Sequence, residues 1–309
     1  MPEQTGSRRL AWDALPGATR ARIERLLGRR VVAAVSQPGG FSEGLAVRAR
    51  LSDGSKVFIK AVPTATAAAN HHRQELTVSQ RLPAEAPVPR LLHALEDDQW
   101  VALIFEEVVG SLPTQPWLPE ELDRVLAGIT ALVDVLTPAP VNASLLAPPR
   151  LGGWSDLIQG PARDGVRALS EWAGNHVEDL AALEAGAQVE GATLLHGDLY
   201  PFNLLLTANR VVVVDWAHAW VGAPFCDAVT LLSGTRLSGM DPEPIAARHP
   251  LTHGLTRQQL DGLLALHSGF LLRTVLSATP AADPNIVAMM TALGRASLTW
   301  LQARWSTTG

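Results

Sequence analysis

The sequence predicts an α+β protein with a β-rich first part and a mainly helical second part. Two observations support this prediction. Short segments in which apolar and polar residues alternate, separated by turn residues, occupy much of the chain before residue 107. From residue 108 on, most segments place apolar residues at helical spacing. We therefore expect two domains, covering residues 1–107 and 108–309.

The first part is expected to contain a leading helix, three strands, a second helix and two more strands. Asp53 and Gly54 separate the second and third strands, and an Asp-Gly pair between alternating segments is typical of a hairpin turn. The five strands are expected to form one sheet. The expected helices cover residues 12–27 and 66–82, and the expected strands cover residues 31–35, 45–51, 56–62, 91–95 and 100–105.

The second part is expected to be helical except between residues 194 and 216, where short apolar runs are broken by polar residues. A proline-rich segment, residues 138–149, is interpreted as a connection within this domain because similar helices flank it. The expected helices cover residues 119–136, 162–185, 223–232, 256–276 and 284–304.

Composition excludes several classes of protein. A formal net charge of −5 argues against a nucleic-acid partner. The single cysteine, Cys226, allows no disulfide within the chain, and the sequence has no run of about 18 apolar residues that could span a membrane. Residues 1–9 lack the apolar core of a signal peptide. These features predict a cytoplasmic protein with no membrane partner.

One segment combines the residue types that phosphoryl transfer needs. His196, Gly197 and Asp198 follow a short apolar run, Asn203 lies five residues after Asp198, and Asp215 ends the apolar run that follows. Phosphoryl transfer requires a carboxylate to orient the attacking hydroxyl and metal ions on the phosphates. Carboxylate and amide oxygens are hard ligands that suit Mg²⁺.

This pattern closely resembles the catalytic motif of the aminoglycoside phosphotransferase and choline kinase superfamily. The resemblance implies a two-lobed protein-kinase-like fold with a β-rich N-terminal lobe and a mainly helical C-terminal lobe. It further implies that Asp198 is the catalytic base, that Asn203 and Asp215 bind Mg²⁺, and that His196 supports the catalytic loop. Asp227 resembles the structural aspartate that supports the same loop from the next helix.

The first part would then be the lobe that binds ATP. Residues 36–44 connect two expected strands and resemble the phosphate-covering loop of these kinases, with Gly39, Gly40 and Ser42 as its candidates for ATP contact. Glycines allow backbone N–H groups to approach phosphate oxygens closely. Any glycine-rich hairpin looks similar, and the segment is not a Walker A sequence.

Lys60 is the candidate for phosphate contact on the third strand. Only two of the 25 basic residues are lysines, Lys56 and Lys60. Strand alternation places Lys60 on one face with Phe58 and opposite Ile59. An inward ammonium at this position would reach the α- and β-phosphates, whereas Lys56 begins the strand and is expected to face solvent.

Glu75 is the expected partner of Lys60, because it is the only acidic residue between residues 62 and 83. It lies on a helical stripe that could face inward, although a solvent-facing Glu75 remains the alternative. His71 and His72 are expected to be exposed, since adjacent residues on a helix point in different directions.

By the same resemblance, adenine would bind the backbone that follows the last strand of the sheet, at Glu106 and Val108. The expected activity is an ATP- and Mg²⁺-dependent transfer of phosphate to a hydroxyl of a small molecule. The alternatives are a protein kinase and a catalytically weak nucleotide-binding regulatory domain. Against a protein kinase, Trp216 and not Phe follows Asp215, and Asp227 comes too soon for a long activation loop.

The acceptor is open between an antibiotic, another natural product, a sugar and an amino alcohol, and an antibiotic acceptor would imply resistance. From residue 223 on, five acidic residues oppose six arginines, which does not favour a dedicated site for polycationic aminoglycosides. Tyr200, Trp216 and Trp220 are candidates for acceptor contact, with simple packing as the alternative for each. The oligomeric state is open between monomer and dimer.

Overall fold

A computed structural model of the protein describes residues 9–37 and 44–306. The chain divides into two compact units, which are described separately. The first consists of Met1–Pro113, Pro140–Ala147 and Pro201–Ala219, and the second consists of Thr114–Ala139, Pro148–Tyr200 and Trp220–Gly309. The nucleotide-binding lobe predicted for residues 1–107 lies within the first unit. Gly39, Gly40 and Ser42 lie outside the described residues.

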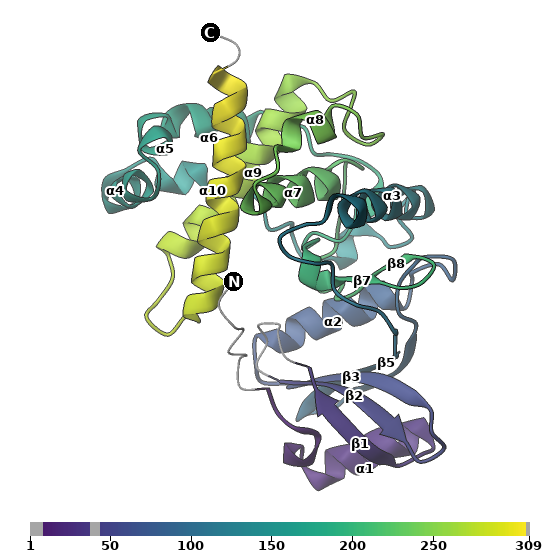
Figure 1. Ribbon diagram of the computed structural model, residues 1–309. Coiled ribbons are helices and arrows are strands. Elements are labelled where there is room, and N and C mark those ends of the chain that lie inside the picture. Colours follow the sequence, from purple (N-terminus) through teal and green to yellow (C-terminus); the bar gives the residue numbers. More distant parts are fainter. Residues whose placement is uncertain (1–8, 38–43, 307–309) are drawn as a thin grey trace. The chain divides into compact units, whose positions relative to one another are not determined.

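The first unit contains the predicted five-stranded sheet, in which all neighbouring strands are antiparallel and the order is β1-β2-β3-β5-β4 (Figure 1). The prediction of these strands is confirmed, with ends that differ by at most one residue. The strands are β1 (Val31–Ser36), β2 (Leu45–Leu51), β3 (Lys56–Pro63), β4 (Leu91–Glu96) and β5 (Trp100–Glu106).

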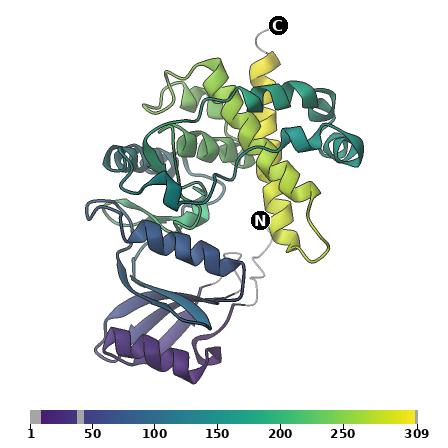
Figure 2. The ribbon, with the colours of Figure 1, turned by 180° about the vertical axis from the view of Figure 1, so that it is seen from behind.

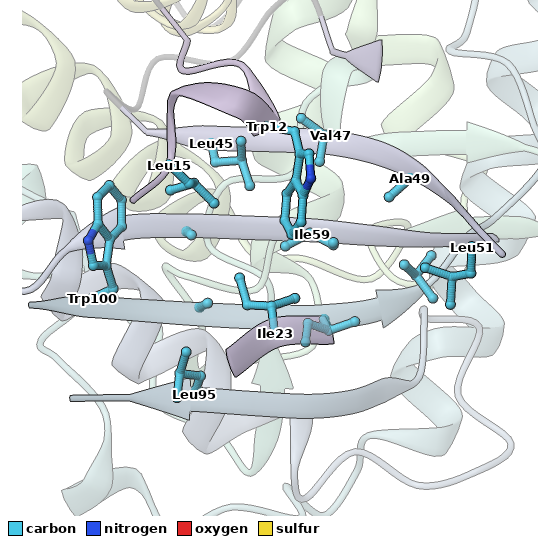
Figure 3. Close-up of a cluster of buried hydrophobic side chains, with 14 residues drawn as sticks. Trp12, Leu15, Ile23, Leu45, Val47, Ala49, Leu51, Ile59, Leu95 and Trp100 are labelled. Carbon is cyan, nitrogen blue, oxygen red and sulfur yellow. The ribbon is translucent and has the colours of Figure 1, made fainter. Parts of the chain in front are cut away.

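Two helices cover the two faces of this sheet, α1 (Gly17–Leu27) on one and α2 (Ala68–Ser79) on the other (Figures 1 and 2). On the α1 face, Trp12 and Ile23 pack with apolar strand residues such as Ile59 in one buried cluster (Figure 3). Burial of this apolar surface is the main stabilising contribution to the unit.

The predicted leading helix over residues 12–27 is shorter than expected. A 3₁₀ turn, η1 (Trp12–Ala14), is separated from α1 because Leu15 is extended, with ψ of 144°. Leu15 precedes Pro16, and the proline ring disfavours the helical conformation of the residue before it.

Two later segments complete the first unit. Residues 140–147 contain the 3₁₀ turn η2 (Ala143–Leu145). The second segment begins with the 3₁₀ turn η4 (Pro201–Asn203) and continues as an antiparallel hairpin of β7 (Leu204–Leu206) and β8 (Val211–Val213). Leu206 exchanges backbone hydrogen bonds with Ser111, which anchors the hairpin to the chain that leaves β5.

The second unit is mainly helical, as predicted. Its two longest helices, α9 and α10, pack along each other in antiparallel directions (Figure 1). A short two-stranded sheet pairs β6 (Thr193–Leu195) with β9 (Trp220–Gly222). The helices are α3 (Pro119–Val135), η3 (Trp154–Leu157), α4 (Gly160–Leu169), α5 (Glu171–Asn175), α6 (Val177–Ala185), α7 (Cys226–Gly234), η5 (Thr235–Ser238), α8 (Pro242–Ala246), α9 (Arg257–Leu276) and α10 (Pro284–Ser306).

The helix predicted for residues 162–185 is instead the three helices α4, α5 and α6. Ser170 is extended, with φ of −156°, and its side chain accepts a hydrogen bond from the backbone N–H of Ala173. This N-cap bond begins α5 and competes with helix continuation, as serine commonly does. Within residues 9–37 and 44–306, no helix is long and apolar enough to cross a membrane.

Candidate active site

Strand β3 places the Lys60 side chain on the α2 face of the sheet. Ile59 and Ala61 point into the cluster under α1, and the alternation of the strand turns Lys60 the other way. Lys60 is held between Ala46 of β2 and Leu103 of β5 in the strand register, so its backbone is fixed on both sides.

The ammonium of Lys60 bridges two carboxylates. Its Nζ donates hydrogen bonds to the two oxygens of Glu75 at 2.8 and 2.9 Å and to Oδ1 of Asp215 at 2.8 Å. The ion pair with Glu75 that the sequence predicts is therefore present, and the solvent-facing alternative for Glu75 is wrong. The contact with Asp215 joins residues 155 positions apart in the chain and was not predicted.

Burial and charge act in opposite directions in this cluster. The side chains of Lys60 and Glu75 are 14% and 4% exposed. Burial lowers the pKa of Lys60, but the carboxylates of Asp215 and Glu75 together outweigh burial and hold that pKa above its ordinary value. Burial raises the pKa of Glu75, and Lys60 opposes this shift. The cluster thus keeps Lys60 charged in a largely enclosed position.

His72, which was expected to be exposed, is buried. It lies on the same stripe of α2 as Glu75, and its Nδ1 is 3.1 Å from the carbonyl oxygen of Ala68. Burial, with the nearby charge of Lys60, lowers the pKa of His72 to about 4, so the imidazole is neutral at pH 7. The helical stripe that predicts an inward Glu75 also includes His72. The position of His72 on that stripe could therefore have predicted its burial.

Asn203 and Asp215 flank the same end of the β7–β8 hairpin. Leu204 pairs with Val213, and one step further the backbone N–H of Val214 donates to the carbonyl oxygen of Asn203 at 3.0 Å. Residues on either side of that bond therefore lie at one edge of the hairpin.

Asp215 has a left-handed backbone, with φ of 70°, which aspartate tolerates better than most residues. Its side chain is 47% exposed, whereas Asn203 is buried. The carboxylate and the amide oxygen at this edge of the hairpin are oxygen ligands of the kind that Mg²⁺ prefers. These residues fit a magnesium site.

In the second unit, the loop after β6 is held by Asp227 of helix α7. The Asp227 carboxylate accepts hydrogen bonds from the backbone N–H of His196 at 2.6 Å and of Gly197 at 3.1 Å. Burial raises the pKa of Asp227, and these two bonds oppose the shift. Gly197 has φ of 74°, a conformation that favours glycine.

His196 supports the loop from within. It is fully buried, and its Nδ1 accepts a hydrogen bond from the backbone N–H of Asp198 at 3.2 Å. The loop thus presents Asp198, whose side chain is 24% exposed, on a rigid backbone. His196 and Asp227 therefore both contact the backbone of the loop that the family resemblance expects them to support.

An arginine that the sequence did not single out lies beside Asp198. Nη1 of Arg150 is 3.9 Å from Oδ1 of Asp198. The two residues are separated by 48 positions, and Arg150 follows a proline-rich segment with no recognisable motif. No local signal in the sequence could have identified this neighbour.

Tyr200 is 8% exposed and belongs to a buried chain of hydrogen bonds. Its hydroxyl lies 2.8 Å from Nε2 of His267 on α9, and Nδ1 of His267 lies 2.9 Å from the hydroxyl of Ser297 on α10. Ser297 donates in turn to Ser233 of α7 at 3.1 Å. Burial lowers the pKa of His267 to about 4. Of the two roles left open for Tyr200, packing is the one that this geometry supports.

The two tryptophans proposed for acceptor contact are also buried. Trp216 is 2% exposed and donates from Nε1 to the carbonyl oxygen of Val213. Trp220 is 7% exposed and pairs with Leu195 between β9 and β6. The structure therefore favours packing for both residues, and the expectation that they form an acceptor surface has no support.

The expected adenine-binding backbone lies at the end of β5. The backbone N–H of Glu106 donates to the carbonyl oxygen of Arg90 at 3.0 Å, and the Glu106 side chain pairs with the Arg90 guanidinium. Glu106 therefore cannot offer its N–H to a base without losing this bond. Val108 lies two residues beyond the strand, in a half-buried segment without regular structure.

Comparison with protein families gives one family for most of the chain. Residues 37–266 match the model of the phosphotransferase enzyme family (APH). Among curated proteins, the chain is 27% identical over 74 residues to the Protein LicA homolog of Mycoplasma capricolum subsp. capricolum. That match spans 24% of this chain and 29% of that protein.

Solved structures with a similar fold include three kinases of small molecules. A GDP complex of aminoglycoside 2'-phosphotransferase-IIIa has a TM-score of 0.58 and 15% identity, covering 91% of this chain and 96% of that one. A ternary complex of aminoglycoside phosphotransferase APH(4)-Ia with AMP-PNP and hygromycin B has a TM-score of 0.56 and 17% identity, covering 92% and 99%.

Amicoumacin kinase hAmiN, in complex with AMP-PNP, Ca²⁺ and Ami, has a TM-score of 0.52 and 12% identity, covering 92% of this chain and 94% of that one. At these identities the likeness establishes the fold alone. It confirms the predicted α+β, two-lobed protein-kinase-like fold.

Proposed function

The chain belongs to the phosphotransferase enzyme family, and on this premise we propose that it transfers the γ-phosphate of ATP, with Mg²⁺, to a hydroxyl of a small molecule. The observation that carries the proposal is the position of Lys60 between Glu75 and Asp215. A lysine held by one buried carboxylate and reaching a second, more exposed carboxylate is suited to binding phosphate oxygens beside a metal ion.

On the nucleotide side, Glu75 holds the ammonium of Lys60, and Lys60 binds oxygens of the α- and β-phosphates. Asn203 and Asp215 would bind Mg²⁺, which neutralises the charge of the phosphates when it is bound. The backbone at Val108, and at Glu106 if its bond to Arg90 opens, would bind adenine, and the loop with Gly39, Gly40 and Ser42 would cover the phosphates. We propose residues 1–107 as the nucleotide-binding lobe and 108–309 as the lobe that binds the acceptor.

On the acceptor side, Asp198 orients the attacking hydroxyl and takes its proton. The hydroxyl oxygen forms a bond to the γ-phosphorus, the bond from that phosphorus to the bridging oxygen breaks, and ADP leaves. Because Asp227 and His196 fix the backbone on both sides of Gly197, the Asp198 carboxylate needs little reorganisation during the reaction.

A protein kinase is the less favoured alternative. Strand β9 and the start of α7 fall within the short segment between Asp215 and Asp227, which leaves no long loop for docking a peptide. A catalytically weak regulatory domain is disfavoured because every residue of the proposed chemistry is present. The structurally similar kinases of hygromycin B and amicoumacin support an antibiotic or another natural product as the acceptor class.

The proposal is tested by incubating the protein with ATP, Mg²⁺ and a library of hydroxylated metabolites and antibiotics. ATP consumption identifies the active mixtures, and mass spectrometry detects a product that carries one additional phosphoryl group. We expect such a product with at least one small molecule. Phosphorylation of peptides in place of small molecules would support the protein kinase, and ATP binding without any transfer would support the regulatory domain.

A further inference from the structure

Arg150 occupies a defined position next to the proposed catalytic base. Its guanidinium carbon lies 4.9 Å from the centre of the Phe270 ring on helix α9, which orients the cation by a cation–π contact. The nearest oxygen of Asp198 is 3.9 Å away, which is too far for a direct hydrogen bond. The side chain of Arg150 is 37% exposed, so a bound molecule could reach it.

The hydrogen-bonding capacity of Arg150 is not used by the neighbouring residues. A guanidinium has five N–H donors in a planar fork that matches a carboxylate or phosphate group. Within residues 9–37 and 44–306, the Arg150 side chain makes the ion pair and the ring contact and donates no hydrogen bond. The ring contact and the ion pair therefore orient the guanidinium of Arg150. Its N–H donors remain available to a ligand.

A cavity of about 610 Å³ lies further along the chain, at the end of α9. Arg273, one turn after Phe270, forms part of its wall and donates to Asp156 at 3.1 Å. The cavity is within the size range of small-molecule sites. Most of its other lining side chains are apolar, among them Val275, Ala278, Ile286, Val287 and Met290.

Several acidic residues near these helices are engaged by other groups. Asp261 pairs with Arg257 and Arg304, and Glu243 pairs with Arg304. The Asp227 carboxylate is used by the catalytic loop. These carboxylates do not form a surface for the ammonium groups of a polycation, and an ammonium close to Arg150 would be repelled.

We infer that Arg150 determines acceptor specificity by binding a carboxylate or phosphate group of the acceptor, next to the hydroxyl that approaches Asp198. The apolar remainder of the acceptor extends past Phe270 toward the cavity at the end of α9. This inference rests on the proposed function and specifies its substrate class as hydroxylated acids with an apolar body.

The test compares three sets of hydroxylated compounds of similar size: carboxylic acids and phosphate monoesters, neutral alcohols, and amines including hygromycin B. Transfer from ATP is measured for wild type, Arg150→Gln and Arg150→Lys, with kcat and KM for the best acceptor of each set. Arg248→Gln is the matched control, because Arg248 also forms a 3.9 Å ion pair, with Asp123, on an exposed surface.

We expect the acids to be the best acceptors of the wild type. Arg150→Gln should lower kcat/KM for acids by at least about tenfold, mainly through KM, since a hydrogen bond to a charged group is lost. Neutral alcohols should change by less than about threefold, because they lack that bond. Arg150→Lys should recover part of the loss, and Arg248→Gln should behave as the wild type.

Three results would overturn the inference and leave the proposed function intact: a preference for amines, a preference for neutral alcohols, or equal losses for acids and alcohols in Arg150→Gln. Equal losses of kcat/KM for acids and alcohols would indicate that Arg150 contacts the transferred phosphoryl group. The absence of a phosphorylated product in all three sets would contradict the proposed function itself, and the inference with it.

Discussion

Replacing Glu75 with Gln tests whether the buried carboxylate serves the reaction through Lys60. At the observed 2.8 Å, a full charge pair in an effective dielectric of about 20 attracts by about 6 kcal/mol before desolvation is subtracted. In the variant a neutral amide replaces the carboxylate and can still accept a weaker bond from Lys60, so the net loss should be that of one charge-assisted hydrogen bond, about 1.5–3 kcal/mol. That range corresponds to a loss of roughly 10- to 150-fold in kcat/KM for ATP.

The assay is a double-mutant cycle of wild type, Glu75→Gln, Lys60→Ala and the double variant, measured as ADP formation at saturating acceptor. If Glu75 acts through Lys60, the double variant should be little worse than Lys60→Ala. Lys56→Ala is the control, since Lys56 is the other lysine of β3 and its side chain is 58% exposed. Independent, multiplicative losses would refute the reasoning.

The remaining predictions concern both units. Asp198→Asn should lower turnover by about 10²- to 10⁴-fold with ATP affinity largely retained, so near wild-type turnover at saturating acceptor would exclude Asp198 as the base. Asp215→Ala should abolish the increase in ATP affinity caused by Mg²⁺, as measured by titration with and without the metal. Tyr200→Phe should lower the free energy of unfolding by about 1–3 kcal/mol, because Nε2 of His267 loses its buried partner. His267 should make stability fall as the pH drops from about 6.5 to about 4, because the unfolded chain binds a proton more readily than the buried imidazole. In denaturant unfolding, the difference in free energy of unfolding between wild type and His267→Gln should decrease by up to roughly 3 kcal/mol over that pH interval. A difference that stays constant with pH would exclude this linkage.

Features that depend on neighbouring residues could be predicted from the sequence. Alternation and the Asp53-Gly54 turn define β2 and β3, and that alternation places Lys60 on the face opposite Ile59. The pairing of Lys60 with Glu75 could be predicted because Glu75 is the only acidic residue of the helix that covers that face. The roles of Asp198, Asn203 and Asp215 came from the family resemblance and remain proposals.

Features that depend on distant segments could not be predicted. The contact between Lys60 and Asp215 and the position of Arg150 beside Asp198 each require residues far apart in the chain. The partnership of Tyr200 with His267 joins a loop to a helix whose side chains show no motif. The break at Ser170 illustrates a second reason: a serine can cap a new helix as readily as it can sit within one, and periodicity does not distinguish the two.

The most direct test of the central claim follows the terminal phosphate of ATP. The protein is incubated with ATP labelled in its γ-phosphate, Mg²⁺ and the best small-molecule acceptor, and the labelled products are separated. We expect the label on the acceptor hydroxyl, no transfer after removal of Mg²⁺, and a rate at least about 10²-fold lower in Asp198→Asn. Label found only in inorganic phosphate, or on the acceptor at an undiminished rate in Asp198→Asn, would contradict the account.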